Sequence, residues 1–441
     1  MTGGERSIRS FVRDTYKNMT LKNLYPSRYR ASCRKAVVPG RVVFLEIREK
    51  ALSDNFRMIR AALEKWNQKK ADSDSTAADA KEPVLWTMET VCIREGMENN
   101  GAVMKNCLAA IPQLAQAQFI FVNESSYFLS SLPIRPETTV IQTWHACGAF
   151  KKFGYSAVGS GFGTTKEDLD TYPVHRNFSY VTVSAPEVVW AYAEAFHMED
   201  RVERILPIGV SRTDMFFSRK YREKAYGKTA WILRRMAPNL FPKHGDVYSD
   251  REEDREQVKD LSAVPGKKLL LYAPTFRGTV GRAKAPDALD IPTLKRLLGK
   301  DYILLINHHP FIKAKDRPKI PDSCRDFAFD MTDHLAIEEL LTAADVCITD
   351  YSSLIFEYSL FERPMIFFAY DLEHYLNERG FYYPVTEMMP GPVCRTTEEV
   401  AEALRKDVEF DLKRVREFKY RFMSGCDGHA TARVLKLMEK S

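Results

Sequence analysis

The chain has 441 residues, of which 45% are hydrophobic, 12% aromatic and 28% charged, and its formal net charge is +6. This composition is close to that of average globular proteins and excludes a disordered chain, a collagen and a coiled coil, while the length favours two domains over one. No run approaches eighteen apolar residues and residues 1–13 lack the apolar core of a secretory signal, so we expect the chain to stay in the cytoplasm.

The first segment of the chain holds much of the positive charge. Residues 1–41 carry ten Lys or Arg against two acidic residues, a local net charge of +8, and aromatic and apolar side chains are interleaved with them. This pattern is typical of a basic amphipathic element on anionic lipid, and equally of a surface helix that packs on its own domain. Nucleic acid binding ranks below both, because no zinc finger, helix-turn-helix or aromatic RNA-binding motif accompanies the charge.

Short β-branched or apolar runs alternate with helical stretches along the rest of the chain, as in parallel sheets covered by helices. The predicted strands lie at residues 41–47, 84–88, 118–122, 138–143 and 180–183, and then at 268–273, 302–307, 346–349 and 365–368. Two α/β domains are therefore expected, one at residues 1–230 and one at 260–425.

The segment between the two strand series, residues 221–264, is rich in charge and has no strand pattern, so the domain junction is expected there or just before it. Residues 400–440 have helical spacing, which allows the chain to cross back to the first domain. Within them, residues 426–441 are expected to form a separate C-terminal helix.

The most informative segment is the strand end Thr349-Asp350-Tyr351-Ser352-Ser353, where a helical pattern begins at once. Ligands of open α/β sheets bind beyond the carboxyl ends of the strands. Free backbone N–H groups at a helix start, joined by the hydroxyls of Ser352 and Ser353, suit a phosphate. Helix capping explains the same residues without a ligand, and both interpretations stay open.

Three further strand ends carry polar side chains. Thr275 and Arg277 follow the strand at 268–273, and a guanidinium grips a phosphate through two parallel hydrogen bonds, although a surface arginine in a turn is the simpler interpretation. His145 ends a strand of the first series, and His309 ends one of the second. Neutral imidazole accepts or shares a proton near physiological pH, and one histidine in each half is harder to attribute to packing alone.

Several common motifs are absent. No GxxxxGK(S/T) loop, GxGxxG fingerprint or GxSxG elbow occurs, so kinase, dehydrogenase and hydrolase functions lose their usual support. Two acidic DxD matches, Asp72-Ser73-Asp74 and Asp168-Leu169-Asp170, follow no predicted strand, and the eight cysteines form neither a CxxC pair nor a zinc spacing. We therefore expect reduced thiols, no metal and no cofactor.

A series of short motifs occurs in a fixed order between residues 138 and 383. They are Gln142-Thr143-Trp144-His145, Lys151-Lys152-Phe153-Gly154, Pro207-Ile208-Gly209-Val210-Ser211-Arg212-Thr213-Asp214, Tyr272-Ala273-Pro274-Thr275-Phe276-Arg277, His309-Pro310, Thr349-Asp350-Tyr351-Ser352-Ser353, Arg363-Pro364, Tyr370-Asp371-Leu372 and Arg379-Gly380-Phe381-Tyr382. Each motif is weak alone, but in this order and spacing the chain resembles the CDP-glycerol glycerophosphotransferases of teichoic acid synthesis.

The resemblance implies a GT-B fold, in which two Rossmann-like domains face each other across a cleft and the second holds the donor. It also implies that His145 is the general base and that His309 lies at the donor diphosphate. The donor-binding residues expected with them are Thr275, Arg277, Thr349, Asp350, Ser352 and Ser353.

The function implied by the resemblance is transfer of glycerol phosphate from CDP-glycerol to an undecaprenyl-linked cell-wall acceptor, with release of CMP, by a peripheral enzyme on the cytoplasmic face of a bacterial membrane. After His145 the chain continues Ala146-Cys147-Gly148, where polymerase-type members have Gly-Thr-Pro, so it is closer to the primase branch. A CDP-ribitol phosphotransferase stays open, because the two donors differ only in polyol length. Two other classes also stay open: a GT-B glycosyltransferase using a nucleotide sugar, and a non-catalytic nucleotide-binding protein, which needs neither histidine.

Overall fold

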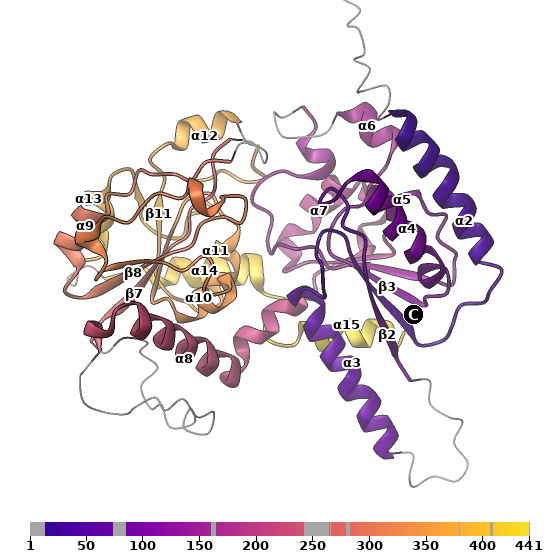
Figure 1. The fold of residues 1–441 in the computed structure, drawn as a ribbon, viewed down its shortest axis with the longest axis horizontal. Helices are drawn as coiled ribbons and strands as arrows, with labels where there is room; N and C mark the ends of the chain where they lie inside the picture. Colours follow the sequence, from indigo (N-terminus) through magenta and orange to yellow (C-terminus); the bar gives the residue numbers. More distant parts are fainter. Residues whose placement is uncertain are drawn as a thin grey trace, which may run out of the picture.

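The structure is a computed structural model, and it describes residues 14–73, 85–159, 165–241, 264, 266–278, 283–378, 380–405 and 409–440. Two six-stranded sheets form two α/β units that lie side by side (Figure 1). Every pair of neighbouring strands in both sheets is parallel. The predicted α/β architecture with two parallel sheets is thereby confirmed.

The first sheet has the strand order β2-β1-β3-β4-β5-β6. Its strands are β1 (Arg41–Glu46), β2 (Thr87–Cys92), β3 (Phe119–Val122), β4 (Thr139–Gln142), β5 (Tyr180–Thr182) and β6 (Ile205–Leu206). Its helices include α2 (Tyr25–Ser32), α3 (Asp54–Ser73), α4 (Asn100–Ala115), α5 (Tyr127–Ser131), α6 (Lys166–Thr171) and α7 (Val189–Phe196). Side chains from α3 pack with one face of β1 and β3, while α2, α4, α5 and α7 contribute to the core on the other face. Burial on both faces explains why β3 is a continuous apolar run.

The second sheet has the strand order β12-β11-β10-β7-β8-β9. Its strands are β7 (Lys268–Tyr272), β8 (Tyr302–Ile306), β9 (Ala328–Asp330), β10 (Val346–Thr349), β11 (Met365–Phe368) and β12 (Val393–Cys394). The helices around it are α8 (Arg219–Met236), α9 (Ile291–Leu298), α10 (Ile337–Ala343), α11 (Leu354–Ser359), α12 (Leu372–Glu378), α13 (Thr397–Ala403) and α14 (Leu412–Met423). Side chains of α9 and α13 cover one face, and α10 and α11 belong to the core on the other.

The end of the chain crosses between the two units. Helix α14 packs against α11, and α15 (Ala430–Met438) packs against α3 of the first unit, where Val434 and Met438 join its core. At the crossing, Gly209 has φ +91° and its backbone meets that of Gly425 so closely that a Cβ on Gly209 would lie 2.1 Å from the Gly425 carbonyl oxygen. The boundaries at residues 230, 260 and 425 stay predictions.

Three short strands were not predicted, and one was predicted in the wrong place. β6, β9 and β12 have only two or three residues, too few for a periodic pattern. The apolar run at residues 84–88 predicts a strand that starts too early. β2 begins at Thr87, and its polar residues Thr87, Glu89 and Thr90 interrupt the apolar pattern by which a strand is recognised. The charged run at 251–256 and residues 1–13 lie outside the described residues.

The basic N-terminal segment is described from Asp14 onward. Tyr25 and Tyr29 on α2 are buried, and the ring of Tyr25 meets that of Phe128 edge-on at 5.2 Å. These two aromatic residues are therefore part of the hydrophobic core of the first unit. The basic residues of the same region, Arg28, Arg30, Arg34 and Lys35, are exposed.

Candidate functional site

A cavity of about 610 Å³ is lined by residues from both units. Four strand ends supply predicted site residues to it. His145 follows β4, Thr275 follows β7 and His309 follows β8. Ser352 and Ser353 follow β10 in the turn that leads into α11. The structure thus brings five of the eight predicted residues to one cavity, at the edge where parallel sheets bind their ligands.

His145 is held by a sharp turn at the end of β4. Trp144 has φ +54°, an uncommon conformation for a large residue, and its backbone is fixed by Gln142 Oε1 and Asn55 Nδ2 at 2.8 and 3.1 Å. The Nδ1 atom of His145 lies 3.2 Å from the carbonyl oxygen of Asn123. Because a carbonyl only accepts, Nδ1 carries the hydrogen and Nε2 keeps its lone pair.

His145 is exposed and lines the cavity between the two units. Although the side chain is exposed to the cavity, many protein atoms surround it, and the resulting desolvation lowers the pKa of His145 to about 4. The hydrogen bond to Asn123 opposes this shift, while the positive charge of Arg212 adds to it. At neutral pH the imidazole is therefore uncharged and able to accept a proton at Nε2.

His309 is oriented in the opposite sense. Its Nδ1 accepts a hydrogen bond from the backbone N–H of Phe311 at 3.2 Å, so the hydrogen of the neutral ring resides on Nε2. The ring packs against Phe276 and Phe311, with centroids 4.8 and 4.7 Å away. Burial lowers the pKa of His309 to about 4, and Lys151 contributes to the same shift. Among the described residues, His145 thus brings an acceptor nitrogen to the cavity and His309 a donor N–H group.

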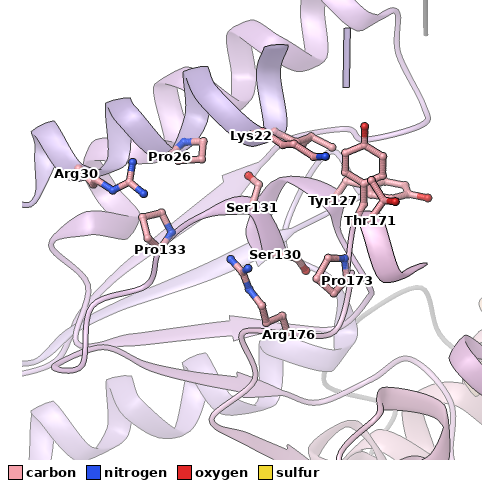
Figure 2. A pocket seen from close by; sticks show the side chains of 12 residues that line it. Lys22, Pro26, Arg30, Tyr127, Ser130, Ser131, Pro133, Thr171, Pro173 and Arg176 are labelled. Carbon is pink, nitrogen blue, oxygen red and sulfur yellow. The ribbon is translucent and has the colours of Figure 1, made fainter. Parts of the chain in front are cut away.

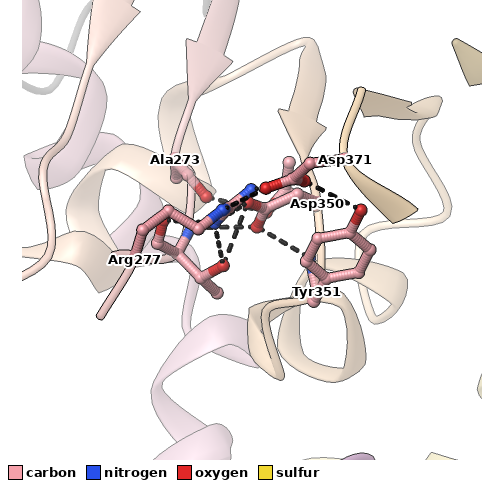
Figure 3. A network of polar contacts seen from close by, with 7 residues as sticks. Ala273, Arg277, Asp350, Tyr351 and Asp371 are labelled. Carbon is pink, nitrogen blue, oxygen red and sulfur yellow. Dashed lines mark hydrogen bonds and ion pairs between the residues drawn. The ribbon is translucent and has the colours of Figure 1, made fainter. Parts of the chain in front are cut away.

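The other three predicted residues lie behind the cavity wall in a polar network (Figure 3). Asp350 is 2% exposed and accepts hydrogen bonds from the backbone N–H and Oγ1 of Thr275 at 2.9 and 3.0 Å. Arg277 donates to Asp350 at 2.9 Å and to both oxygens of Asp371 at 2.6 and 2.9 Å. Thr349 Oγ1 donates to the carbonyl of Ala273 at 2.7 Å.

This network ties the turns after β7, β10 and β11 to one another. Burial opposes the charge on Arg277, but Asp371 and Asp350 outweigh it and raise the pKa of the guanidinium. Because both edges of the guanidinium already bind carboxylates, Arg277 positions the turns in this structure and does not reach into the cavity. The direct donor contacts predicted for Arg277, Thr349 and Asp350 stay predictions.

Arg212 is a cavity residue that the motif analysis quoted without assigning it a role. It lies on the 3₁₀ segment η6 (Ser211–Phe217) and forms an ion pair with Glu357 of α11, and a longer one, at 3.7 Å, with Glu338 of α10. All three side chains line the cavity. The Arg212–Glu357 pair connects the two units beside His145. From the sequence, only the position of Arg212 in an ordered motif could have indicated that it belongs to the site.

Two further findings bear on the expected absences. Within the described ranges, no group of three or more His, Cys, Asp or Glu is placed to hold a metal ion, and no helix is long and apolar enough to cross a membrane. Asp168, from one of the two DxD matches, binds Lys17 and the hydroxyl of Tyr127 instead. Arg379, from the last motif, lies outside the described residues.

Two Rossmann-like units whose strand ends meet at a shared cavity define a GT-B-like protein. A solved structure of a variant of the wall teichoic acid polymerase TagF, soaked with CDPG, has this fold. It matches with a TM-score of 0.67 and 25% identity, covering 98% of this chain and 97% of that chain. The predicted fold is confirmed.

A family model described as CDP-Glycerol:Poly(glycerophosphate) glycerophosphotransferase matches residues 27–231 and 234–440, and the chain belongs to this family. The teichoic acid ribitol-phosphate primase of Bacillus spizizenii is 34% identical over 95% of this chain and 96% of that protein. The teichoic acid poly(ribitol-phosphate) polymerase of the same organism is 33% identical over 73% of this chain, but the match spans 46% of that protein. The predicted family is confirmed, and the match extends well beyond residues 138–383.

Proposed function

We propose that this chain transfers a polyol phosphate from a CDP-linked donor to a lipid-linked teichoic acid acceptor and releases CMP. The observation that carries the proposal is the pair of neutral histidines, His145 and His309, which face one cavity from different units in opposite tautomers. A phosphoryl transfer to a hydroxyl needs both a proton acceptor for the attacking oxygen and donors for the phosphate oxygens. This cavity contains both.

The reaction assigned to these groups is a displacement at phosphorus. The acceptor hydroxyl gives its proton to Nε2 of His145 while its oxygen forms a bond to the phosphorus that bears the polyol. The bond from that phosphorus to the bridging oxygen breaks, and CMP leaves with the electron pair. Nε2–H of His309 and the hydroxyls of Ser352 and Ser353 are the donors assigned to the diphosphate oxygens, while the hydroxyl hydrogen of Thr275 is already donated to Asp350. General base assistance is worth roughly 10²–10⁴ in rate.

The polyol is the finer part of the proposal. The sequence motifs favour CDP-glycerol, and the family description names glycerophosphate. CDP-ribitol is the second candidate, and the 34% identity to a ribitol-phosphate primase over nearly the whole chain favours it. The same coverage supports a primase over a polymerase, since the polymerase match spans less than half of that protein.

The place of action proposed with this function is the cytoplasmic face of the membrane, to which the chain binds peripherally. The exposed cations of α2 and the residues after it, Arg28, Arg30, Arg34 and Lys35, support this location. Because Tyr25 and Tyr29 are buried in the first unit, attachment through the described part of this segment rests on charge and not on inserted aromatic rings.

Release of CMP tests the proposal, with CDP-glycerol and CDP-ribitol offered separately and together to a lipid-linked disaccharide acceptor. His145→Ala is expected to lower turnover by roughly 10²–10⁴ while donor binding stays near wild type. His309→Ala is expected to weaken donor binding as well as turnover. His374→Ala, on the exposed side of α12 outside the cavity, is the matched control. Near wild-type turnover of His145→Ala, or transfer from a UDP-sugar in place of both CDP-polyols, would overturn the proposal.

A further inference from the structure

A second cavity, of about 320 Å³, lies in the first unit and shares no lining residue with the first cavity. It is bounded by the π-helical segment η1 (Asn18–Leu24), α2, α5 and the turn after α6 (Figure 2). Helix α2 lies on the flank of the first unit that faces away from the second sheet (Figure 1). A ligand in this cavity therefore does not compete with the donor for space.

The cavity collects positive charge from three separate segments. Lys22 comes from η1, Arg30 from α2 and Arg176 from the turn after α6, and no Asp or Glu lines the cavity. In the part of the chain that the structure describes, none of these three cations forms an ion pair; Lys22 lies over the ring of Tyr172 at 5.2 Å. All three side chains are exposed, and together they give the opening a positive potential that attracts an anion.

A buried hydroxyl in the wall lacks a partner. Ser130 is 5% exposed, lines the cavity, and its Oγ has no hydrogen-bond partner among the described residues. Its neighbour Ser131 differs, because its Oγ donates to the carbonyl of Phe128 at 2.6 Å. Buried polar groups are nearly always satisfied, so this enclosed hydroxyl has a hydrogen bond to gain by turning toward a ligand in the cavity.

The walls of the cavity are held together by hydrogen bonds and an ion pair that involve neither the three cations nor Ser130. Asp168 of α6 binds Lys17 at 3.1 Å and the hydroxyl of Tyr127 at 2.7 Å. The hydroxyl of Tyr172 donates to Asn18 at 3.1 Å. These bonds fix η1, α5 and α6 relative to one another, so the opening is already formed before a ligand enters and little ordering is needed on binding.

We propose that this cavity is a phosphate-binding site that takes the phosphate group of an anionic membrane lipid. Arg30 and Arg176 supply planar donors that match phosphate oxygens, and Lys22 adds a third charge. Ser130 Oγ, which is enclosed in the wall, donates the remaining hydrogen bond after its side chain rotates toward the phosphate. The proposal rests on the membrane location proposed above and makes it specific, because a defined site replaces diffuse attraction. Free phosphate or diphosphate has the same chemistry and is the second source that the experiment distinguishes.

The experiment compares the full chain on two kinds of phosphatidylcholine vesicle with equal surface charge, one made anionic by phosphatidylglycerol and the other by oleate. Arg30→Gln and Arg176→Gln are each expected to weaken binding to the phosphatidylglycerol vesicles about fivefold and to remove the preference over oleate. Arg28→Gln, an exposed residue of the same helix outside the cavity, is the matched control and keeps the preference. Equal losses from all three variants on both vesicles would mean diffuse attraction only and overturn the site.

Calorimetric titration with inorganic pyrophosphate distinguishes the two sources. A vesicle preference without pyrophosphate binding supports the lipid, whereas pyrophosphate binding that Arg30→Gln and Arg176→Gln weaken, without any vesicle preference, keeps the site but overturns the lipid as its ligand. If the chain shows neither a vesicle preference nor pyrophosphate binding, the site is overturned.

Ser130→Ala separates a ligand role from a structural one. Removing an orphan hydroxyl is expected to leave Tm unchanged or higher, while the preference for phosphatidylglycerol falls about tenfold because a hydrogen bond to a charged group is lost. A lower Tm with an unchanged preference would contradict the proposal. CMP release with a soluble acceptor is measured on the same variants and is expected to stay at wild-type level, so failure of this site and failure of the proposed transferase are distinguishable.

Discussion

Replacement of Arg277 by Met distinguishes two roles for this residue. Its side chain is 17% exposed and is bound by Asp350, which is 2% exposed, and by Asp371, which is 16% exposed. Removing the cation leaves two carboxylates without their partner, and breaking a buried pair in this way costs about 3–5 kcal/mol. If the second unit unfolds cooperatively, a loss of that size lowers Tm by about 10 °C. If Arg277 only bound the donor phosphate, its replacement would leave Tm unchanged.

Differential scanning calorimetry measures the Tm, and titration with CDP-glycerol and CDP-ribitol measures donor affinity. Arg296→Met, on the exposed side of α9, is the matched control and is expected to change stability by less than about 0.5 kcal/mol. The double variant Arg277→Met with Asp371→Asn should regain part of the loss, because one uncompensated charge disappears. A tenfold loss of donor affinity with Tm within about 2 °C of wild type would refute the structural role.

Four further outcomes are expected. Since the pKa of His145 is lowered to about 4, kcat/KM should be flat from pH 8 to 6 and fall as pH approaches 4. The free energy of unfolding should be unaffected by this histidine above pH 6.5 and should decline as pH falls toward 4, because the unfolded chain then binds the proton first. An inflection of kcat/KM near pH 6.5 would contradict this. Gly148→Ala should lower both Tm and CMP release, because Gly148 has φ +64° and its Cβ would lie 2.2 Å from the Phe356 ring of the other unit; unchanged Tm would argue against this contact. His175→Phe should leave Tm unchanged or raised, because Nδ1 is buried without a partner among the described residues and burial lowers the pKa of the ring to about 3; a fall in Tm would reveal a partner. CMP release is expected to persist in excess EDTA, and complete loss restored by magnesium or manganese would show that a metal is required.

The part of the fold that the sequence predicts is the centre of each sheet. β10 and β11 have the predicted bounds, because strands buried on both faces are short continuous apolar runs. The strands that were missed or misplaced, β2, β6, β9 and β12, are the four edges of the two sheets. An edge strand is short or partly exposed, so its sequence carries little hydrophobic pattern, and its pairing depends on tertiary contacts.

A similar limit applies to the site. Residues directly after a central strand, such as His145, Thr275 and His309, can be placed from the sequence because parallel strands end at one edge of their sheet. The partners of those residues cannot. Arg212 and Glu357 are 145 positions apart and lie in different units, and nothing in their local spacing predicts their ion pair. Asp371 likewise binds Arg277 across 94 positions, so the network that occupies Arg277 is visible only in three dimensions.

The two histidines acquire different tautomers through one backbone group each. Asn123 offers His145 a carbonyl at the end of β3, whereas Phe311 offers His309 an N–H in the turn after β8. Exchanging the donor and acceptor character of these two groups would exchange the two tautomers, and with them the base and the hydrogen-bond donor of the proposed mechanism. Because the imidazoles belong to different units, the proposed chemistry is complete only while the units stay together. Under the proposed mechanism, the Arg212–Glu357 pair, the Gly148–Phe356 contact and the return of α15 to the first unit are therefore conditions of activity as well as of stability.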